Sequence, residues 1–211
     1  MTITRREFCT GTAALAFAAS TGLERAFAET VSSVVLMAPH PLGEMAIGNE
    51  KASVTIIEYA SMTCSHCATF HNTVYPEMKK KYIDTGKVKY ILREFPLDPL
   101  AAAGFMLARC AGNDKYAAVV EMLFNKQKEW VTQNPIPPLL TLAKQAGFTD
   151  QSFESCLKDQ KVLEAIESVR THGAEKLGVN STPTFFINGK LHRGTLTIDE
   201  LDKQLQPLLK S

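Results

Sequence analysis

The spacing of apolar residues changes along the chain, and each change predicts where a strand gives way to a helix. Residues 53–60 are rich in β-branched and aromatic side chains, which predicts a buried strand. The following residues are apolar at helical intervals and predict a helix over 65–84, with a kink at Pro76. Residues 87–95 alternate again and predict a second strand, parallel to the first in a right-handed βαβ unit.

The segment 98–178 has helical spacing throughout. A crossover between parallel strands needs only about a dozen residues, so the surplus predicts an inserted lobe of helices. Five helices are expected there, and the apolar faces that mark them contain Leu107, Val120, Leu140, Phe153 and Val169.

Strand spacing returns after the insertion. Residues 184–188 and 190–193 predict two strands joined by a hairpin turn at Asn188-Gly189. A helix with an apolar stripe from Ile198 to Leu208 closes the chain, and a short edge strand is expected at 45–47. The order β-α-β, insertion, β-β-α is that of an α/β thioredoxin-like fold with an all-helical insertion.

The expected domain division follows from this order. It comprises an export signal peptide (1–28), a lead-in segment (29–48), a thioredoxin-like domain (49–97 and 179–211) and an inserted helical domain (98–178).

Two cysteines stand where the first strand gives way to the helix, in the stretch Cys64-Ser65-His66-Cys67. The first turn of a helix offers unpaired backbone N–H groups and the positive end of the helix dipole, and both favour a thiolate. A stable thiolate is a good leaving group in disulfide exchange. We therefore predict that Cys64 is the nucleophile, that Cys67 lies one turn inward and resolves the mixed disulfide, and that His66 tunes the reactive sulfur.

A C-x-x-C pair alone is also compatible with a structural disulfide or with half of a zinc site. Zinc would require two further ligands, and the sequence has no second C-x-x-C or H-x-x-x-H pair. We expect no metal and no cofactor, because the strand–C-x-x-C–helix context favours redox chemistry of the cysteines themselves.

The stretch Ile57–Cys67, with the distant Ser181-Thr182-Pro183-Thr184-Phe185, resembles the DsbA family of bacterial thiol:disulfide oxidoreductases over about residues 43–209. These are thioredoxin-fold proteins with an inserted helical domain. The family's best-known member has Pro where Ser65 stands, a difference that bears on the redox potential. The resemblance implies a cis peptide bond between Thr182 and Pro183, in a loop that faces the two cysteines. It also implies that the backbone of Thr182 pairs with an extended substrate.

Glu58 lies inside the first predicted strand, where a carboxylate is costly unless it is paired or protonated. One interpretation places Glu58 at a rim or pairs it with a lysine. The other makes it a proton relay to the thiol of Cys67, as the related acid of thioredoxin-like proteins suggests. His71, one helical turn beyond Cys67, is expected to be solvated.

Cys110 and Cys156 lie on apolar faces of the expected helical lobe, far apart in sequence. The alternatives are two buried thiols or a structural disulfide, and an oxidising compartment favours the disulfide. Closing a loop of this length would stabilise the protein by roughly 4 kcal/mol in the chain-entropy model.

The start of the chain has the features of an export signal: Arg5-Arg6, an apolar run over 11–23, and Ala26-Phe27-Ala28 before the expected cleavage site after Ala28. Residues 4–8 resemble a twin-arginine signal, with a general secretory signal as the alternative. Removal of the signal would remove Cys9 and leave four cysteines in the periplasm, where disulfides form.

The composition, 45% hydrophobic with a net charge of +1, fits one compact domain with an inserted lobe and argues against a nucleic-acid partner. We predict an oxidoreductase that donates the Cys64–Cys67 disulfide to reduced or unfolded exported proteins. The resemblance to the DsbA family implies that a quinone-linked membrane oxidase of the DsbB type restores the disulfide. We expect a monomer, because no amphipathic helix long enough for a dimerisation stalk precedes the fold. The alternatives are a disulfide isomerase or reductase that uses the same pair, and a non-catalytic client-binding assembly factor.

Overall fold

The computed structural model describes residues 32–210, so the predicted export signal and Cys9 lie outside the described residues. Within this range a mixed sheet of five strands, in the order β1-β3-β2-β4-β5, forms the centre of the molecule. The strands are β1 (Ala46–Gly48), β2 (Val54–Ala60), β3 (Val88–Glu94), β4 (Thr184–Ile187) and β5 (Lys190–Arg193). β2 and β3 pair in parallel and the other neighbours pair in antiparallel fashion, which confirms the predicted thioredoxin-like arrangement.

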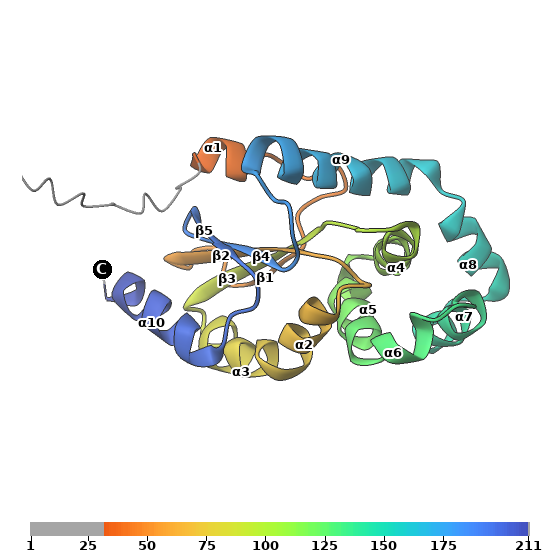
Figure 1. Ribbon diagram of the computed structural model, residues 1–211, viewed down its shortest axis with the longest axis horizontal. Coiled ribbons are helices and arrows are strands. Elements are labelled where there is room, and N and C mark those ends of the chain that lie inside the picture. Colours follow the sequence, from red (N-terminus) through yellow and green to blue (C-terminus); the bar gives the residue numbers. More distant parts are fainter. Residues whose placement is uncertain (1–31, 211) are drawn as a thin grey trace, which may run out of the picture.

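Helices cover both faces of this sheet, as Figure 1 shows. One face packs against α2 (Ser65–Thr73), α3 (Tyr75–Met78), a π-helical turn (Lys79–Ile83) and α10 (Ile198–Leu209). The other face packs against α1 (Ser33–Leu36) and α9 (Gln160–Leu177). Because the central strands are covered on both sides, β2 and β3 are buried at nearly every position.

The helix predicted over 65–84 is divided into three segments, and Pro76 explains the first division. α2 ends at Thr73, and α3 begins at Tyr75 with the proline in its first turn. A proline there has no N–H to donate to the preceding turn, so the two segments do not continue as one helix.

The helical insertion lies between β3 and β4 and forms the right-hand part of Figure 1. It contains α4 (Pro99–Cys110), α5 (Asn113–Asn125), α6 (Gln127–Trp130), α7 (Ile136–Gln145) and α8 (Asp150–Leu157), and continues into α9. α6 was not predicted, because a single turn shows no period in the sequence. A disulfide joins Cys110 of α4 to Cys156 of α8.

The second half of α9 returns to the sheet, and a glycine makes this close approach possible. A Cβ atom at Gly173 would lie 2.8 Å from Cε1 of Tyr59 on β2, a distance that no side chain could occupy. α9 therefore contacts both the insertion and the sheet. None of the helices within residues 32–210 combines the length and the apolar character that crossing a membrane requires.

Candidate active site

The loop 61–64 carries the chain from the end of β2 to the start of α2 and places the two cysteines differently. Cys64 is the N-cap residue of α2, with extended backbone angles (φ −75°, ψ 118°), and it is half-buried. Cys67 lies one turn further along the helix and is 0% exposed. Only Cys64 is therefore within reach of another protein.

Two residues of the insertion hold this loop in place. The hydroxyl of Thr63 donates to Oδ2 of Asp98 at 2.5 Å, and Asp98 also caps the start of α4. The amide of Gln127 donates to the carbonyl oxygens of Met62, at 2.8 Å, and Cys64, at 3.0 Å. We did not predict Gln127, because its partners are backbone atoms that leave no sequence signal.

The loop before β4 faces the reactive sulfur. The thiol of Cys64 donates to the carbonyl oxygen of Thr182 at 3.3 Å, and the Thr182–Pro183 peptide bond is cis. Since Thr184 of β4 pairs with Tyr59 near the end of β2, the sheet register itself places this loop beside the active-site loop. The backbone N–H of Thr182 forms no hydrogen bond with any residue in the range 32–210, so it is available to a ligand.

The surroundings of Cys64 stabilise its anion and lower its pKa to about 5. The largest cause is a hydrogen bond from the Cys67 thiol, which outweighs the opposing effect of burial. The Thr182 side chain and the backbone N–H groups of Cys67 and His66 also favour the thiolate. The Thr182 hydroxyl forms no hydrogen bond with the Cys64 thiol or with any other described group. Its proton is therefore free to point at the sulfur when Cys64 is an anion.

The other cysteine behaves in the opposite way. Burial raises the pKa of Cys67 well above its ordinary value, and the hydrogen bond to Cys64 and the charge of Glu58 add to this. At neutral pH one sulfur is therefore an anion and the other a thiol. The imidazole of His66 is exposed and forms no hydrogen bond or ion pair with a described residue, so its tuning role stays a prediction.

A pair of variants tests whether the hydrogen bond from Cys67 is the largest cause of the low pKa of Cys64. Cys67→Ala removes the donor to Cys64, whereas Cys67→Ser keeps an O–H donor at the same place. A hydrogen bond to a charged group contributes about 1.5–3 kcal/mol, so the pKa of Cys64 should be about 1–2 units higher in the alanine variant than in the serine variant. The thiolate absorbance at 240 nm, followed against pH, measures this. Equal pKa values in the two variants would assign the low pKa to the helix terminus instead.

Glu58 is 0% exposed on β2, and its partners come from two other elements. The hydroxyl of Tyr90 on β3 donates to Oε2 of Glu58, and Nε2 of His71 lies 3.2 Å from the same oxygen. The interpretation that placed Glu58 at a rim or beside a lysine is therefore wrong. The expectation for His71 is wrong as well, because this residue is only 6% exposed.

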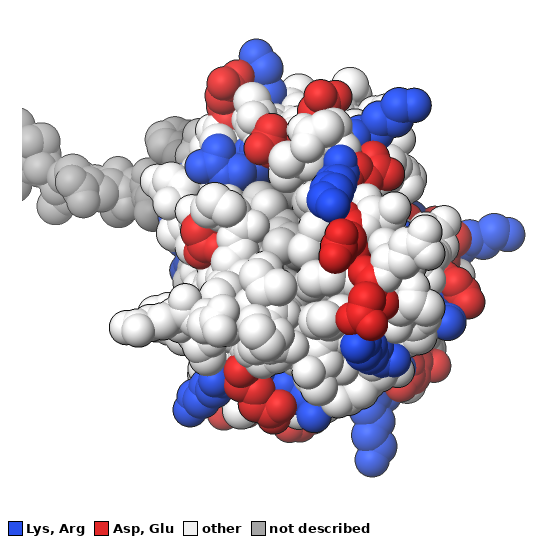
Figure 2. Space-filling model, turned by 90° about the vertical axis from the view of Figure 1, so that its right-hand side faces the viewer, with Lys and Arg blue, Asp and Glu red and all other residues white. Residues whose placement is uncertain are grey.

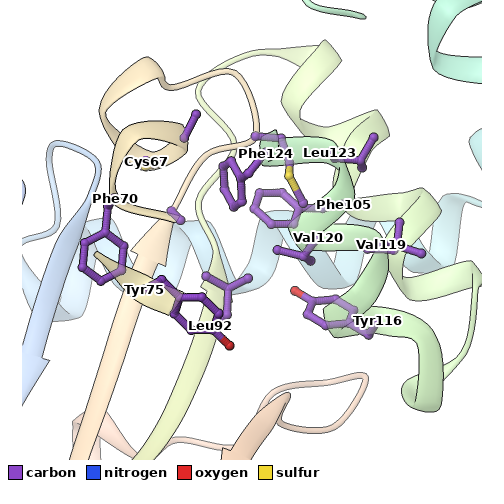
Figure 3. Packing of buried hydrophobic residues seen from close by; sticks show 14 of the residues in the cluster. Cys67, Phe70, Tyr75, Leu92, Phe105, Tyr116, Val119, Val120, Leu123 and Phe124 are labelled. Carbon is purple, nitrogen blue, oxygen red and sulfur yellow. The ribbon is translucent and has the colours of Figure 1, made fainter. Parts of the chain in front are cut away.

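Cys67 and His71 are four residues apart and lie on the same buried face of α2. In Figure 3 the side chains of Cys67 and Phe70 extend from α2, and Phe124 approaches from α5. The His71 ring stacks on Phe124, with the centroids 4.2 Å apart. The structure thus brings Glu58, His71 and Cys67 into one apolar environment beneath Cys64.

Comparisons with known proteins agree with this site. The sequence model of the family described as Thioredoxin matches residues 41–207. A putative protein-disulfide oxidoreductase of Rickettsia felis is 33% identical over 169 residues, which are 79% of this chain and 60% of the relative. This chain therefore spans about 60% of the length of that relative.

Two further relatives are matched over most of their length. The probable disulfide bond formation protein D of Bacillus anthracis is 30% identical over 178 residues, which are 79% of each chain. The crystal structure of alpha-DsbA1 of Wolbachia pipientis is similar with a TM-score of 0.78 and 32% identity, covering 85% of this chain and 96% of that one.

Fold and site together define a thioredoxin-fold protein with a helical insertion and a C-x-x-C pair at the start of its first long helix. The chain belongs to the thioredoxin family, in its DsbA-like branch.

Proposed function

We propose that this chain is a periplasmic thiol:disulfide oxidoreductase that donates the Cys64–Cys67 disulfide to exported proteins as they fold. The observation that carries the proposal is the contrast between a half-buried sulfur with a stable anion and a buried sulfur that keeps its proton. Reduction of a disulfide between two such sulfurs is favourable, because Cys64 is released as a stable thiolate.

The reaction has two exchange steps. A client thiolate attacks Sγ of Cys64, the bond between the two enzyme sulfurs breaks, and Cys67 leaves with the electron pair and takes up a proton. The second client thiolate then attacks the client sulfur of the mixed disulfide, and Cys64 leaves as the thiolate. The client gains a disulfide, the enzyme becomes a dithiol with one proton on Cys67, and the other client proton passes to solvent.

Client binding involves the loop of Thr182 and Pro183. Its free backbone N–H lies next to Cys64, where an extended client segment can pair as an added strand. A hollow of about 680 Å³ lies next to the active-site loop and is lined in part by Leu97, Ala103 and Met106. Leu97 is 51% exposed, which suits apolar segments of unfolded clients. Figure 2, which faces the insertion, shows cationic and anionic residues interspersed rather than one charged patch.

The reaction would take place in the periplasm and would need a partner that reoxidises the enzyme. Residues 1–28 would direct export and be removed after Ala28, and a quinone-linked membrane oxidase of the DsbB type would restore the disulfide. The mature protein would act as a monomer on reduced or unfolded exported proteins. The Cys110–Cys156 disulfide would have a structural role only, because it joins two helices of the insertion and Cys156 is buried.

The equilibrium of the Cys64–Cys67 couple with glutathione tests the proposal. We expect a reduction potential nearer to about −120 mV, as in strongly oxidising members of this fold, than to about −270 mV, as in reducing ones. The oxidised protein should also oxidise a reduced client faster than it rearranges a client with scrambled disulfides. A potential near the reducing value, or a preference for the scrambled client, would support the isomerase or reductase alternative instead.

A further inference from the structure

A cavity of about 70 Å³ lies beside His71 and Tyr90, the two hydrogen-bond partners of Glu58, between β1, β3 and α5. A volume of this size has room for about two or more water molecules. His71 lines it, and so do Tyr75, Leu92 and Tyr116, which are labelled in Figure 3. Glu121 stands at its wall and is exposed to solvent. The cavity therefore offers water a route from the surface between β1 and α5 to the imidazole of His71.

Two buried polar atoms at this place have no hydrogen-bond partner among residues 32–210. They are Oε1 of Glu58 and Nδ1 of His71. Such orphan atoms are rare in folded proteins and call for a bound water or a functional reason. Water in the cavity would satisfy Nδ1 of His71. Oε1 of Glu58 has no hydrogen bond with the thiol of Cys67, so a second water would have to join the carboxyl to this thiol, which lies one turn from His71 on the same face of α2.

We propose that His71 carries protons between the water of this cavity and Glu58, which exchanges them with Cys67 during disulfide exchange. This inference rests on the proposed function. When the client thiolate bonds to Cys64, the departing sulfur of Cys67 takes a proton from the Glu58 carboxyl through the water between them. His71 then gives the proton on Nε2 to Glu58 and takes one from cavity water on Nδ1, so that Glu58 ends as it began and the proton of His71 has moved from Nε2 to Nδ1. Reoxidation of the enzyme moves one proton outward along the same groups.

The position of the cavity explains why such a route is needed. Cys67 is 0% exposed, and a client bonded to Cys64 covers the remaining approach to it from the helix terminus. A proton that enters between β1 and α5 passes behind α2 and is not hindered by the client. Carboxyl and imidazole groups both accept and donate protons, which a chain of this kind requires.

The ring of His71 is held in one orientation by its neighbours. It stacks on Phe124 and packs against Tyr75, with ring centroids 5.0 Å apart. The titratable and charged groups that face it or line its two adjoining hollows are Glu58 of β2, Tyr75 of α3, Lys79 of the π-helical turn, Tyr90 of β3, Tyr116 and Glu121 of α5, and Lys126, which follows α5.

The test compares three variants in the oxidised full-length protein. His71→Phe keeps the stacking and removes both ring nitrogens, and Ala117→Leu fills the cavity while leaving the side chains of Glu58 and His71 unaltered. His192→Phe, on β5, is the matched control. Stopped-flow measurement of mixed-disulfide formation with a single-cysteine peptide, in H₂O and in D₂O, gives the rate and its solvent isotope effect.

We expect the first two variants to react about tenfold more slowly or worse, with a larger isotope effect than the wild type. The control should match the wild type. The equilibrium constant with glutathione should be the same in Ala117→Leu, His192→Phe and the wild type, because a relay changes the rate of proton transfer and not its end point. His71→Ala should regain activity when imidazole is added to the buffer.

Three results would overturn the relay. They are wild-type rates in both His71→Phe and Ala117→Leu, slow rates without a changed isotope effect, and a slow His71→Ala variant that imidazole does not restore. If His71→Phe does not fold, Ala117→Leu decides the question. Failure of the proposed function itself would appear differently, as a wild-type protein that does not exchange with the peptide or has a reducing potential.

Discussion

Replacing Cys64 by serine is expected to lower disulfide exchange at least about 1,000-fold, because no other described thiol combines exposure with a stable anion. Cys67→Ser should have a different effect. This variant keeps the reactive sulfur, and it should form a mixed disulfide with a single-cysteine peptide that persists, because the resolving thiol is missing. Mass spectrometry after reaction of each variant with a peptide activated as its nitrothiobenzoate disulfide measures both outcomes.

The control for this experiment is the double variant Cys110→Ser/Cys156→Ser. It removes the other two cysteines of the described chain and should exchange at the wild-type rate. The assignment fails if Cys64→Ser still captures the peptide, or if Cys67→Ser captures none. Either result would make Cys67 the attacked sulfur in spite of its burial.

The fold could be predicted because its main signals are local in sequence. The change from strand to helix spacing around Cys64 placed the two cysteines at a helix start, and the structure has α2 begin at Ser65. The hairpin at Asn188-Gly189 was predicted from residue chemistry alone, and Pro76 was predicted to kink the helix that the structure divides into α2 and α3. The parallel pairing of β2 with β3 followed from the single helical connection between them.

The site could be predicted only where the chemistry lies in a single segment. Glu58 could be identified as unusual from its strand, but its partners, His71 and Tyr90, belong to two other elements. We expected His71 to be solvated, because nothing in the sequence near this residue indicates that it contacts a buried carboxylate on another element. Gln127 had no signal at all. The cis bond before Pro183 was inferred from family resemblance, since cis is uncommon even before proline.

A second buried carboxylate decides how strongly the lead-in segment and the insertion are held to the sheet. Oε1 of Glu94 accepts from Nε of Arg109, at 2.6 Å, and from the hydroxyl of Tyr116, at 2.9 Å, and Nε2 of His40 lies 2.8 Å from Oε2. Arg109 also donates to the carbonyl oxygen of Gly43 at 3.0 Å. Glu94 thus joins β3, α4, α5 and the lead-in at one point, and each oxygen of its carboxylate has a partner.

Burial alone would raise the pKa of Glu94, but the hydrogen bond from His40 and the charge of Arg109 outweigh it and lower the pKa to about 2. A pKa that is lower in the folded than in the unfolded state adds stability above the unfolded value, which is about 4.5. This stability is lost as the pH falls from about 4.5 toward 2. The difference of about 2.5 pKa units corresponds to roughly 3 kcal/mol.

Glu94→Gln is therefore expected to lower the free energy of unfolding by about 3–5 kcal/mol at pH 7, because it also leaves the buried charge of Arg109 without its partner. The deficit relative to the wild type should shrink between about pH 4.5 and 2, where the wild type loses the same charge. Urea unfolding followed at several pH values measures both. Glu154→Gln is the matched control, because its ion pair with Lys158 is exposed and should contribute less than about 0.5 kcal/mol. A Glu94→Gln variant that stays within about 1 kcal/mol of the control, with the wild-type dependence on pH, would show that the neutral hydrogen bonds hold the junction and that the buried charge does not.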